Sequence, residues 1–458
     1  MRRLLNRKEF LALSALGALG VAAHGAAPSR RRTARNGILR HACIGTIGIG
    51  TQDFAQLTEH PKLKVVALCD VDSNHLAEAA TKAPEARLYS DWREMFAREG
   101  DNIDSCNISV PDHMHAIITL EAIRAGIHVY CQKPLAHDVV ECRAMTIAAR
   151  GAGIVSQLGT QHASGPGDRL AVHFLREGVL GKVSRVILCS NRTSAVPFRL
   201  EGPRPVQGET PPASLNWDLW LGNAPERPYA PDIYHTKKWR SWQDFGTGWS
   251  GDIGCHIFDA VWKGLGLTAP ESVVANVQPS WRESPARRAD TWPQSKHITW
   301  TFPGNEKTAS RELQVEWFDG DIFPPAEAQE ISTRLGFAKY PEEAALVIGT
   351  EGSLLLPHRS GPRLYPLEKF SNLSKPDLSG PDHHARFVDA CLGGAPTDSR
   401  FDQTGPMSEA ILLGTVAVRL PGQRLDWDAR ALRIPNFPSA DKLLRRKYRK
   451  GWEVDLSV

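Results

Sequence analysis

Three side chains at two places in the sequence have the chemistry needed to oxidise an alcohol. Lys133 follows an apolar run in the segment Cys131-Gln132-Lys133-Pro134, and Asp252 stands four residues before His256. If residues 252–259 are helical, Asp252 and His256 lie on one face of that helix. Removing hydride from a hydroxyl-bearing carbon requires one group that takes the hydroxyl proton and another that stabilises the developing oxyanion. An imidazole, a lysine and a carboxylate can fill these roles, although each alone is more often structural.

A glycine-rich loop near residue 45 resembles the GxGxxG fingerprint of dinucleotide-binding sites. Gly45 and Gly50 fill its first and third positions, where glycine allows a tight turn and close packing of helix on strand. Ile47 occupies the second position, where the backbone approaches the pyrophosphate. Gly48, one residue later, restores part of that clearance. The motif alone is weak, and its context strengthens it.

An acid follows this loop at the spacing typical of a ribose-binding residue. Asp70 ends the second apolar run, 25 residues after Gly45. A carboxylate there accepts hydrogen bonds from the ribose hydroxyls and repels a 2′-phosphate. Because no Lys or Arg follows until Lys82, we expect NAD rather than NADP.

Residues 41–160 alternate short apolar runs with amphipathic stretches, which predicts βαβ units and a doubly wound parallel sheet of the Rossmann type. The strand-like runs are 41–44, 63–68, 106–110, 127–131 and 154–158, and the helix-like stretches are 54–59, 75–82, 92–98, 115–124 and 139–150. We therefore expect an α/β domain that binds NAD over 41–160.

Residues 161–458 have a different character. A helix over 168–176, strands near 183–189, 298–302, 313–317 and 354–356, and helices near 384–392 and 408–420 surround a Pro/Gly-rich loop over 196–212. This mixture predicts an α+β domain with an open, mostly antiparallel sheet that binds substrate and mediates oligomerisation. Ten of the 13 tryptophans lie between Trp217 and Trp317. Such residues usually belong to a core or an interface, but Trp239 and Trp249 are placed to stack on a sugar ring.

Taken together, these segments resemble the Gfo/Idh/MocA oxidoreductases, the family of glucose–fructose oxidoreductase and inositol dehydrogenase. The pair Lys133-Pro134 is similar to the family's Glu-Lys-Pro motif, with Gln132 in place of the Glu. The Asp252-to-His256 stretch is similar to its second-domain motif, and residues 111–115 to the loop after the preceding strand. The resemblance continues through 217–222 and 239–240 to 448–452, and it is closest to the exported branch of the family.

The resemblance implies roles for individual residues. Lys133 and His256 would be the catalytic pair, with His256 the general base, Lys133 the donor to the reacting oxygen, and Asp252 positioning the substrate hydroxyls. Pro111 and His115 would lie near the nicotinamide ribose, and Lys133 and Pro134 would also bind the cofactor. Gln161 and Arg240 would contact substrate. The resemblance also implies a homodimer or homotetramer.

The basic excess of the chain sits at its N-terminus. The sequence has 55 Lys and Arg against 51 Asp and Glu. Residues 1–40 hold nine of the basic residues and one acid, which leaves 46 basic and 50 acidic residues for 41–458. The folded part therefore lacks the basic balance typical of nucleic-acid-binding domains.

Residues 1–27 have the layout of a signal peptide: basic residues, the apolar run 11–23 and small residues. Asn6-Arg7-Lys8 resembles a twin-arginine (Tat) signal, with a lysine in place of the second arginine. We expect residues 28–40 to be a basic linker and the protein to be exported to the periplasm without a membrane anchor. A cytoplasmic protein with an uncleaved N-terminal tail is the alternative.

The eight cysteines show no CxxC pair, and small buried hydrophobes are the favoured interpretation, particularly for Cys43, Cys69, Cys106 and Cys131. No Cys or His cluster with zinc spacing surrounds His113 and His115, so we predict no metal. Residues 383–384 indicate a helix start or a contribution to the cleft.

Three functions remain open from the sequence. The first is an NAD-dependent dehydrogenase acting on a sugar, cyclitol or related polyol. The second is a redox-neutral glycosidase with permanently bound NAD, which oxidises a sugar, allows elimination and reduces the product. The third is a ligand-binding protein without catalysis, which an intact Lys133, Asp252 and His256 argue against.

Overall fold

The computed structural model describes residues 34, 36–194 and 200–457. The signal peptide and most of the basic linker that the sequence predicts lie outside these residues. None of the helices in the described part of the chain is long and apolar enough to cross a membrane.

The first domain is built on a six-stranded sheet in which every neighbouring pair is parallel. Its order is β3-β2-β1-β4-β5-β6. The strand order reverses at β1, whose neighbours are β2 and β4. In open α/β sheets, ligands bind at such a topological switch point. The strands are β1 (Leu39–Ile44), β2 (Leu63–Cys69), β3 (Arg87–Tyr89), β4 (Ser105–Ile108), β5 (His128–Cys131) and β6 (Ser156–Leu158).

Helices α2–α6 connect these strands. Three begin at an aspartate whose side chain accepts a backbone N–H of the first turn: Asp72 before α3, Asp91 before α4 and Asp138 before α6. The bounds are α2 (Ile49–Thr58), α3 (Ser73–Ala80), α4 (Trp92–Glu99), α5 (His115–Arg124) and α6 (Val139–Ala152). The predicted Rossmann sheet is confirmed.

The second domain holds an eight-stranded sheet with the order β13-β12-β11-β7-β10-β9-β8-β14. Only β7 and β10 pair in parallel, and the other neighbours are antiparallel. The predicted mostly antiparallel sheet is therefore also confirmed. The strands are β7 (Val183–Ser190), β8 (Ser272–Val277), β9 (Lys296–Pro303), β10 (Glu312–Asp319), β11 (Glu343–Gly349), β12 (Ser353–Pro357), β13 (Arg363–Tyr365) and β14 (Leu425–Asp426).

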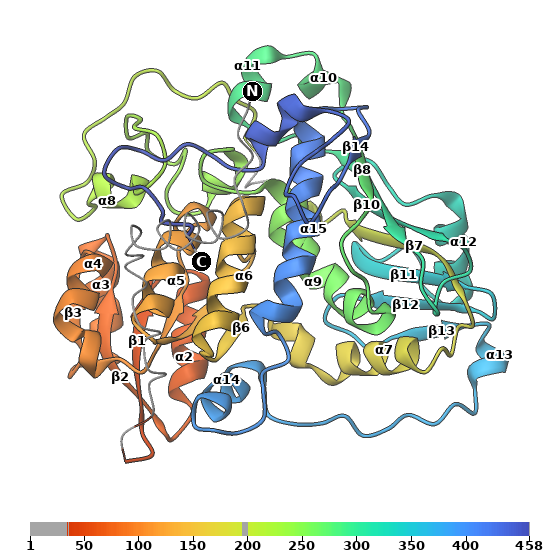
Figure 1. The fold of residues 1–458 in the computed structure, drawn as a ribbon, viewed down its shortest axis with the longest axis horizontal. Coiled ribbons are helices and arrows are strands. Elements are labelled where there is room, and N and C mark those ends of the chain that lie inside the picture. The colour runs from red at the N-terminus through yellow and green to blue at the C-terminus, as the bar shows by residue number, and fades with distance from the viewer. Residues whose placement is uncertain (1–33, 35, 195–199, 458) are drawn as a thin grey trace, which may run out of the picture.

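Two late helices, α14 and α15, pack against helices of the first domain (Figure 1). The long helix α15 packs against α6 of the first domain and α9 of the second. The shorter α14 packs against α2, so a late part of the chain completes the first domain. The bounds are α7 (Pro166–Arg176), α8 (Trp217–Leu221), α9 (Gly248–Leu265), α10 (Pro279–Arg282), α11 (Pro285–Asp290), α12 (Ala326–Arg334), α13 (Leu367–Phe370), α14 (His383–Cys391) and α15 (Phe401–Arg419).

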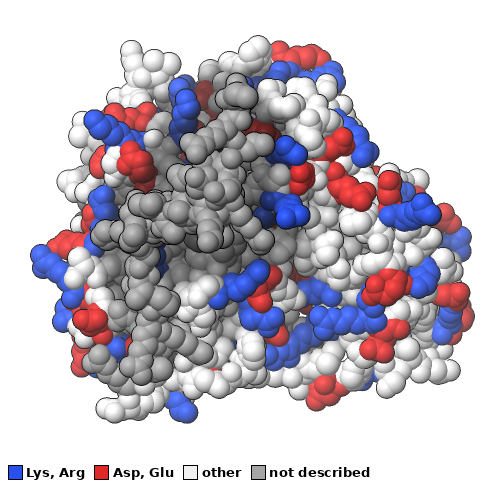
Figure 2. All heavy atoms as spheres, viewed as in Figure 1, with Lys and Arg blue, Asp and Glu red and all other residues white. Residues whose placement is uncertain are grey.

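Side chains of both charges mix on the surface. On the face shown in Figure 2, Lys and Arg lie among Asp and Glu outside the grey residues. All eight cysteines are buried, as the sequence predicts, and none of them forms a disulfide among the described residues.

Candidate active site

A cleft of about 890 Å³ lies where the two domains meet. Its walls come from the carboxyl ends of the first sheet, from the first turns of α9, and from a 3₁₀ turn over Lys238–Ser241. Two ends of the cleft matter below. The lysine end is Lys133, Arg240, Asp252 and His256, and the Asp70 end is Asp70, Asp72, His75 and His235.

The glycine loop follows β1 directly and lines the cleft. Gly45 has φ +83°, and a Cβ there would come within 2.3 Å of the Ser109 carbonyl oxygen. A Cβ at Gly50 would come within 2.2 Å of the Gly45 carbonyl oxygen. These two glycines are therefore required by packing, as the fingerprint predicts. Gly48, at φ +60°, faces open space.

The N-terminus of α2 opens onto this loop. The preceding residue, Gly48, provides no side-chain cap, and the first turn of α2 carries no acid. Uncapped N–H groups at a helix N-terminus attract anions such as a pyrophosphate. A helix end without a side-chain cap, beside a glycine loop with open space, therefore fits a dinucleotide, despite Ile47 in the loop.

Asp70 lies at the end of β2, with its carboxylate held by neighbouring groups. Its Oδ2 accepts hydrogen bonds from the backbone N–H and the hydroxyl of Thr46, at 2.8 and 2.9 Å. Its Oδ1 accepts the N–H of Asp72 at 3.0 Å. The carboxylate borders the cleft beside the glycine loop, which is the place expected for a group that binds the ribose.

An ion pair between the domains forms the lysine end. Lys133 Nζ lies 2.7 Å from Asp252 Oδ1, and Arg240 Nε lies 3.4 Å from Asp252 Oδ2. Burial alone would raise the pKa of Asp252, but Lys133 and Arg240 outweigh it and lower that pKa. Asp252 is thus a carboxylate that fixes both cations.

His256 lies one turn further along α9, beside two more imidazoles. The His256 and His358 rings are 5.3 Å apart, and His162 and His358 are 4.8 Å apart. Burial, then Lys133, then His358 lower the pKa of His256 well below its usual value. His256 is therefore neutral near pH 7. Its buried Nδ1 has no hydrogen-bond partner among the described residues.

Asp112 is a buried acid that the sequence analysis does not single out. Burial and the nearby Asp252 raise the pKa of Asp112 to about 7. Its Oδ2 accepts the backbone N–H and the hydroxyl of Thr247, at 3.1 and 2.9 Å. Within the described chain its Oδ1 finds no partner, which agrees with a proton held there.

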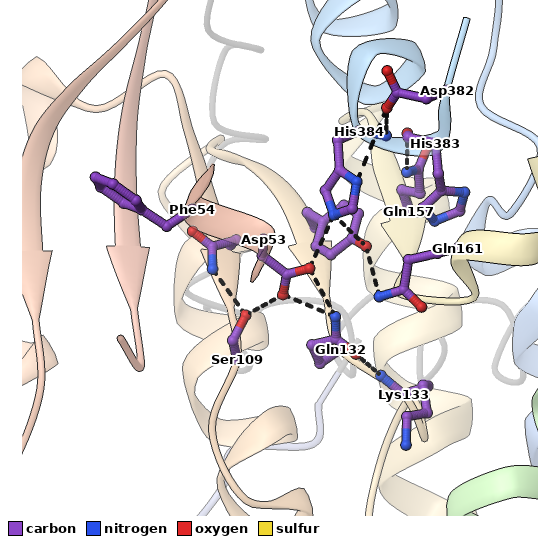
Figure 3. Close-up of polar contacts among 12 residues, drawn as sticks. Asp53, Phe54, Ser109, Gln132, Lys133, Gln157, Gln161, Asp382, His383 and His384 are labelled. Atoms are coloured by element: carbon purple, nitrogen blue, oxygen red, sulfur yellow. Dashed lines mark hydrogen bonds and ion pairs between the residues drawn. The ribbon is translucent and has the colours of Figure 1, made fainter. Parts of the chain in front are cut away.

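A second buried acid, Asp53 on α2, organises the floor of the cleft (Figure 3). It accepts hydrogen bonds from the Gln132 amide at 2.8 and 3.0 Å, from Ser109 Oγ at 2.7 Å and from His384 Nε2 at 2.9 Å. The substitution of Gln132 for the Glu of the motif therefore does not leave the site without a carboxylate, because Asp53 supplies one beside it.

Most of the residues predicted for the site border the cleft, but three do not. His115 is fully buried, with its ring nitrogens 2.7 Å from the Pro134 carbonyl oxygen and 2.9 Å from that of Val110. It ties two loops together behind the wall, and Gly50 and Pro134 also stand back from the cleft. The predicted residues at the wall are Gly45, Ile47, Gly48, Asp70, Pro111, Lys133, Gln161, Arg240, Asp252 and His256.

The tryptophans singled out by the sequence also reach the cleft. Trp239 and Trp249 contribute to its wall, and the guanidinium of Arg240 lies 4.2 Å from the Trp239 ring centre. His384 also lines the cleft, and α14 begins at His383. Residues 383–384 therefore both start a helix and contribute to the cleft.

Comparison with solved structures gives the same two-domain arrangement. The WlbA dehydrogenase from Bordetella pertussis, solved with NADH and UDP-GlcNAcA, matches with a TM-score of 0.59 and 16% identity over 85% of this chain and 99% of that one. An inositol dehydrogenase homologue from Azotobacter vinelandii matches with a TM-score of 0.55 and 14% identity, over 87% of this chain and 99% of that one. At these identities the likeness concerns the fold.

Sequence relatives match over shorter segments. A levoglucosan dehydrogenase from Pseudarthrobacter phenanthrenivorans is 32% identical over 123 residues, 27% of this chain and 30% of that protein. A glycosyl hydrolase family 109 protein from Stenotrophomonas maltophilia is 31% identical over 139 residues, 28% of this chain and 29% of that protein. The chain thus matches about a third of the length of these curated relatives.

Family models cover more than half of the chain. Residues 39–160 match the oxidoreductase family model for the NAD-binding Rossmann fold, and residues 171–304 match the model for its C-terminal alpha/beta domain. The glycine loop, Asp70, Lys133, Asp252 and His256 all fall within these ranges. The chain belongs to the Gfo/Idh/MocA family of oxidoreductases.

Proposed function

We propose that this protein is an NAD-dependent oxidoreductase that transfers hydride between a carbohydrate, cyclitol or related polyol and a nicotinamide cofactor. The observation that carries the proposal is the contact of Lys133 with Asp252 at 2.7 Å, one helical turn from His256, in the cleft that the glycine loop also borders. These groups come from two domains, so the fold itself assembles the combination that the chemistry needs.

The lysine end performs the proton chemistry. His256 is neutral near pH 7 and can take the proton of a substrate hydroxyl. Lys133 donates a hydrogen bond to the same oxygen and stabilises the charge that develops there. Asp252 holds Lys133 in position through its ion pair. A nicotinamide bound beside the glycine loop would supply the acceptor for the hydride.

The charge of the cleft supports a substrate that carries an acidic group. Four cations, Lys133, Arg192, Arg240 and Arg359, border the cleft. Lys133 and Arg240 are paired with Asp252, and Arg192 lies 3.6 Å from Glu343, so the support comes from Arg359. Arg359 is exposed at the turn between β12 and β13, and no described residue forms an ion pair with it. We therefore propose a sugar acid as substrate. An Arg359→Gln variant should raise KM for an acidic sugar without raising KM for the matching neutral sugar, and an equal change for both would contradict this preference.

Nucleotide content and one substitution test the assignment. Protein purified, denatured and analysed for released nucleotide should yield NAD, or else bind added NAD in a titration. His256→Ala should reduce turnover of the best carbohydrate substrate by about 100-fold or more, while leaving the dissociation constant for NAD within about twofold. The matched control is His173→Ala on α7. Unchanged turnover in His256→Ala would refute its role as the base.

A redox-neutral glycosidase is the second candidate, and the segment shared with the glycosyl hydrolase family 109 protein favours it. Such an enzyme would keep NAD through each turnover. Cleavage of a glycoside without net NADH formation, and with near-stoichiometric bound NAD in the purified protein, would distinguish it from an exchanging dehydrogenase.

Export and assembly are proposals that rest on the leader and the family resemblance. We propose export to the periplasm through the Tat pathway and assembly into a homodimer or homotetramer. Replacing Arg7 and Lys8 by glutamine should leave the protein in the cytoplasm of its host. Light scattering of the purified protein should give two or four times the mass of one chain.

A further inference from the structure

Three metal-ligating side chains meet at the Asp70 end of the cleft. Asp72 is the residue that caps α3, His75 lies in the first turn of that helix, and His235 comes from the second domain. One donor atom of each lies within 4.8 Å of the other two. His75 Nδ1 is 3.7 Å and His235 Nε2 is 3.8 Å from the same oxygen, Asp72 Oδ2.

These contacts are too long for hydrogen bonds. His75 Nδ1 and His235 Nε2 are buried atoms without a hydrogen-bond partner among the described residues. Buried ring nitrogens without partners are costly, so a group that satisfies both is expected between them. The hydrogen bond that caps α3 uses the other oxygen of Asp72, because Asn74 N–H donates to Oδ1. Oδ2 is thus oriented toward the two imidazoles.

The backbone holds the three residues in place. Asp72 forms a β-bridge with Leu215, and the N–H of Ser73 donates to the Ser214 carbonyl oxygen at 2.9 Å. The His235 ring packs edge-on against Trp220, with centres 6.1 Å apart. The second domain is therefore docked on the β2–α3 connection by main-chain contacts, and His235 faces His75 across the cleft end.

We propose that Asp72, His75 and His235 bind a divalent transition-metal ion of the zinc class. Two imidazoles and one carboxylate form a common ligand set for zinc, with metal–ligand distances of about 2.1 Å. Two such ligands on a tetrahedral ion are about 3.4 Å apart, close to the 3.7 and 3.8 Å found here. His75 and His235 are 160 residues apart in the sequence, so no zinc-type spacing marks this site.

The ion would act as a clamp between the domains. His75 and His235 border the cleft, whereas Asp72 lies behind them and is 7% exposed. Binding only to the folded state stabilises a protein by mass action, so the metal should raise the melting temperature. The inference stands independently of the proposed activity.

Metal binding by the full chain tests the proposal. Protein treated with a chelator and freed of it is titrated with ZnCl₂ in a calorimeter and with CoCl₂ in a spectrophotometer. We expect one equivalent of Zn²⁺ with a dissociation constant of about 1 μM or lower, visible d–d absorption from bound Co²⁺, and a higher melting temperature with Zn²⁺.

Variants assign the binding to these residues. His75→Ala and His235→Ala should each weaken Zn²⁺ binding by at least about 100-fold, more than a second-shell change costs. Asp72→Asn keeps a side chain that caps α3 well, so it should weaken binding while leaving the melting temperature of the metal-free protein nearly unchanged. The control His173→Ala should bind as the unmodified protein does. Absence of binding, or binding that survives both histidine variants, would overturn the proposal.

Discussion

The two ends of the cleft are assembled from the same kinds of segment, but their polar side chains are paired differently. Each joins the carboxyl end of a first-domain strand to a segment of the second domain. At the lysine end, Lys133 and Arg240 lie 2.7 and 3.4 Å from the oxygens of Asp252. At the Asp70 end, two imidazole nitrogens face one carboxylate oxygen of Asp72 at 3.7 Å or more. At the lysine end the charged groups are paired with one another, whereas at the Asp70 end these polar atoms are too far apart to form hydrogen bonds.

The pairing of charges at each end indicates which chemistry that end suits. A site whose ions are already paired keeps its geometry while a proton moves in and out, which suits acid–base chemistry. A site whose polar atoms point toward one another without forming hydrogen bonds suits the binding of an ion or a ligand between them. Substitutions at the lysine end should therefore leave a buried charge unpaired. Substitutions at the Asp70 end should instead alter the affinity for a nucleotide or a metal ion.

The largest expected effect is at the lysine end. Lys133→Met removes the proposed donor to the reacting oxygen and leaves the buried Asp252 carboxylate with Arg240 alone. Turnover, followed as NADH formation, should fall by about 1000-fold. Lys62→Met, an exposed lysine, is the matched control. A loss of less than tenfold would show that the paired charges of this end are structural.

The second largest effect is expected when a second acid is placed on the floor of the cleft, and it concerns the stability of the fold. Gln132→Glu restores the motif's residue but sets a carboxylate against Asp53, whose oxygens now accept the Gln132 amide. Like charges buried together should lower the free energy of unfolding at pH 8 by about 3 kcal/mol. Gln132→Glu with Asp53→Asn should recover most of the loss. Denaturant titrations measure this, with the exposed Gln423→Glu as control, and an unaffected single variant would contradict it.

A smaller effect concerns the pH dependence of stability. Burial and Asp252 raise the pKa of Asp112 to about 7, above its value of about 3.9 in an unfolded chain. Between these values the folded protein holds a proton that the unfolded chain releases, so this group makes stability fall as pH rises. Asp112→Asn mimics the protonated acid. The difference in unfolding free energy, variant minus wild type, should be about 2 kcal/mol greater at pH 8 than at pH 5. Denaturant titrations at both pH values that give the same difference would contradict the raised pKa.

The smallest effect is at the Asp70 end. Asp70→Ser removes the proposed acceptor for the ribose hydroxyls, together with the charge that we expect to repel a 2′-phosphate. The dissociation constant for NAD should rise by about tenfold, and the preference for NAD over NADP should shrink by a similar factor. Titrations with both nucleotides measure this, and Glu78→Ser on the exposed side of α3 is the control. Equal preference before and after the change would show that Asp70 does not face the ribose.

Much of the first domain could be predicted because buried parallel strands are continuous apolar runs and their helices are amphipathic. Strand β3 escaped detection because it has three residues, of which Tyr89 alone is buried. The motif residues Lys133, Asp252 and His256 were found by type and spacing, and their roles stay predictions.

Contacts between distant segments could not be predicted in the same way. Asp53 and His384 lie 331 residues apart in the chain and 2.9 Å apart in space. Asp53 sits on an amphipathic helix, where an acid normally faces water. Only tertiary packing buries it, and only the folded chain brings His235 to His75. No periodicity in the sequence carries that information.

The packing of α14 on α2 has a consequence for the order of events during synthesis. The cluster formed by Leu39, Leu57, Tyr130, Phe387 and Val388, together with the His384–Asp53 contact, is complete only when about six-sevenths of the chain has been made. N-terminal segments leave the ribosome first and begin to fold there. The floor of the site in the first domain therefore cannot be completed until α14 has been synthesised. Binding of a nucleotide to the finished site should therefore follow the synthesis of α14.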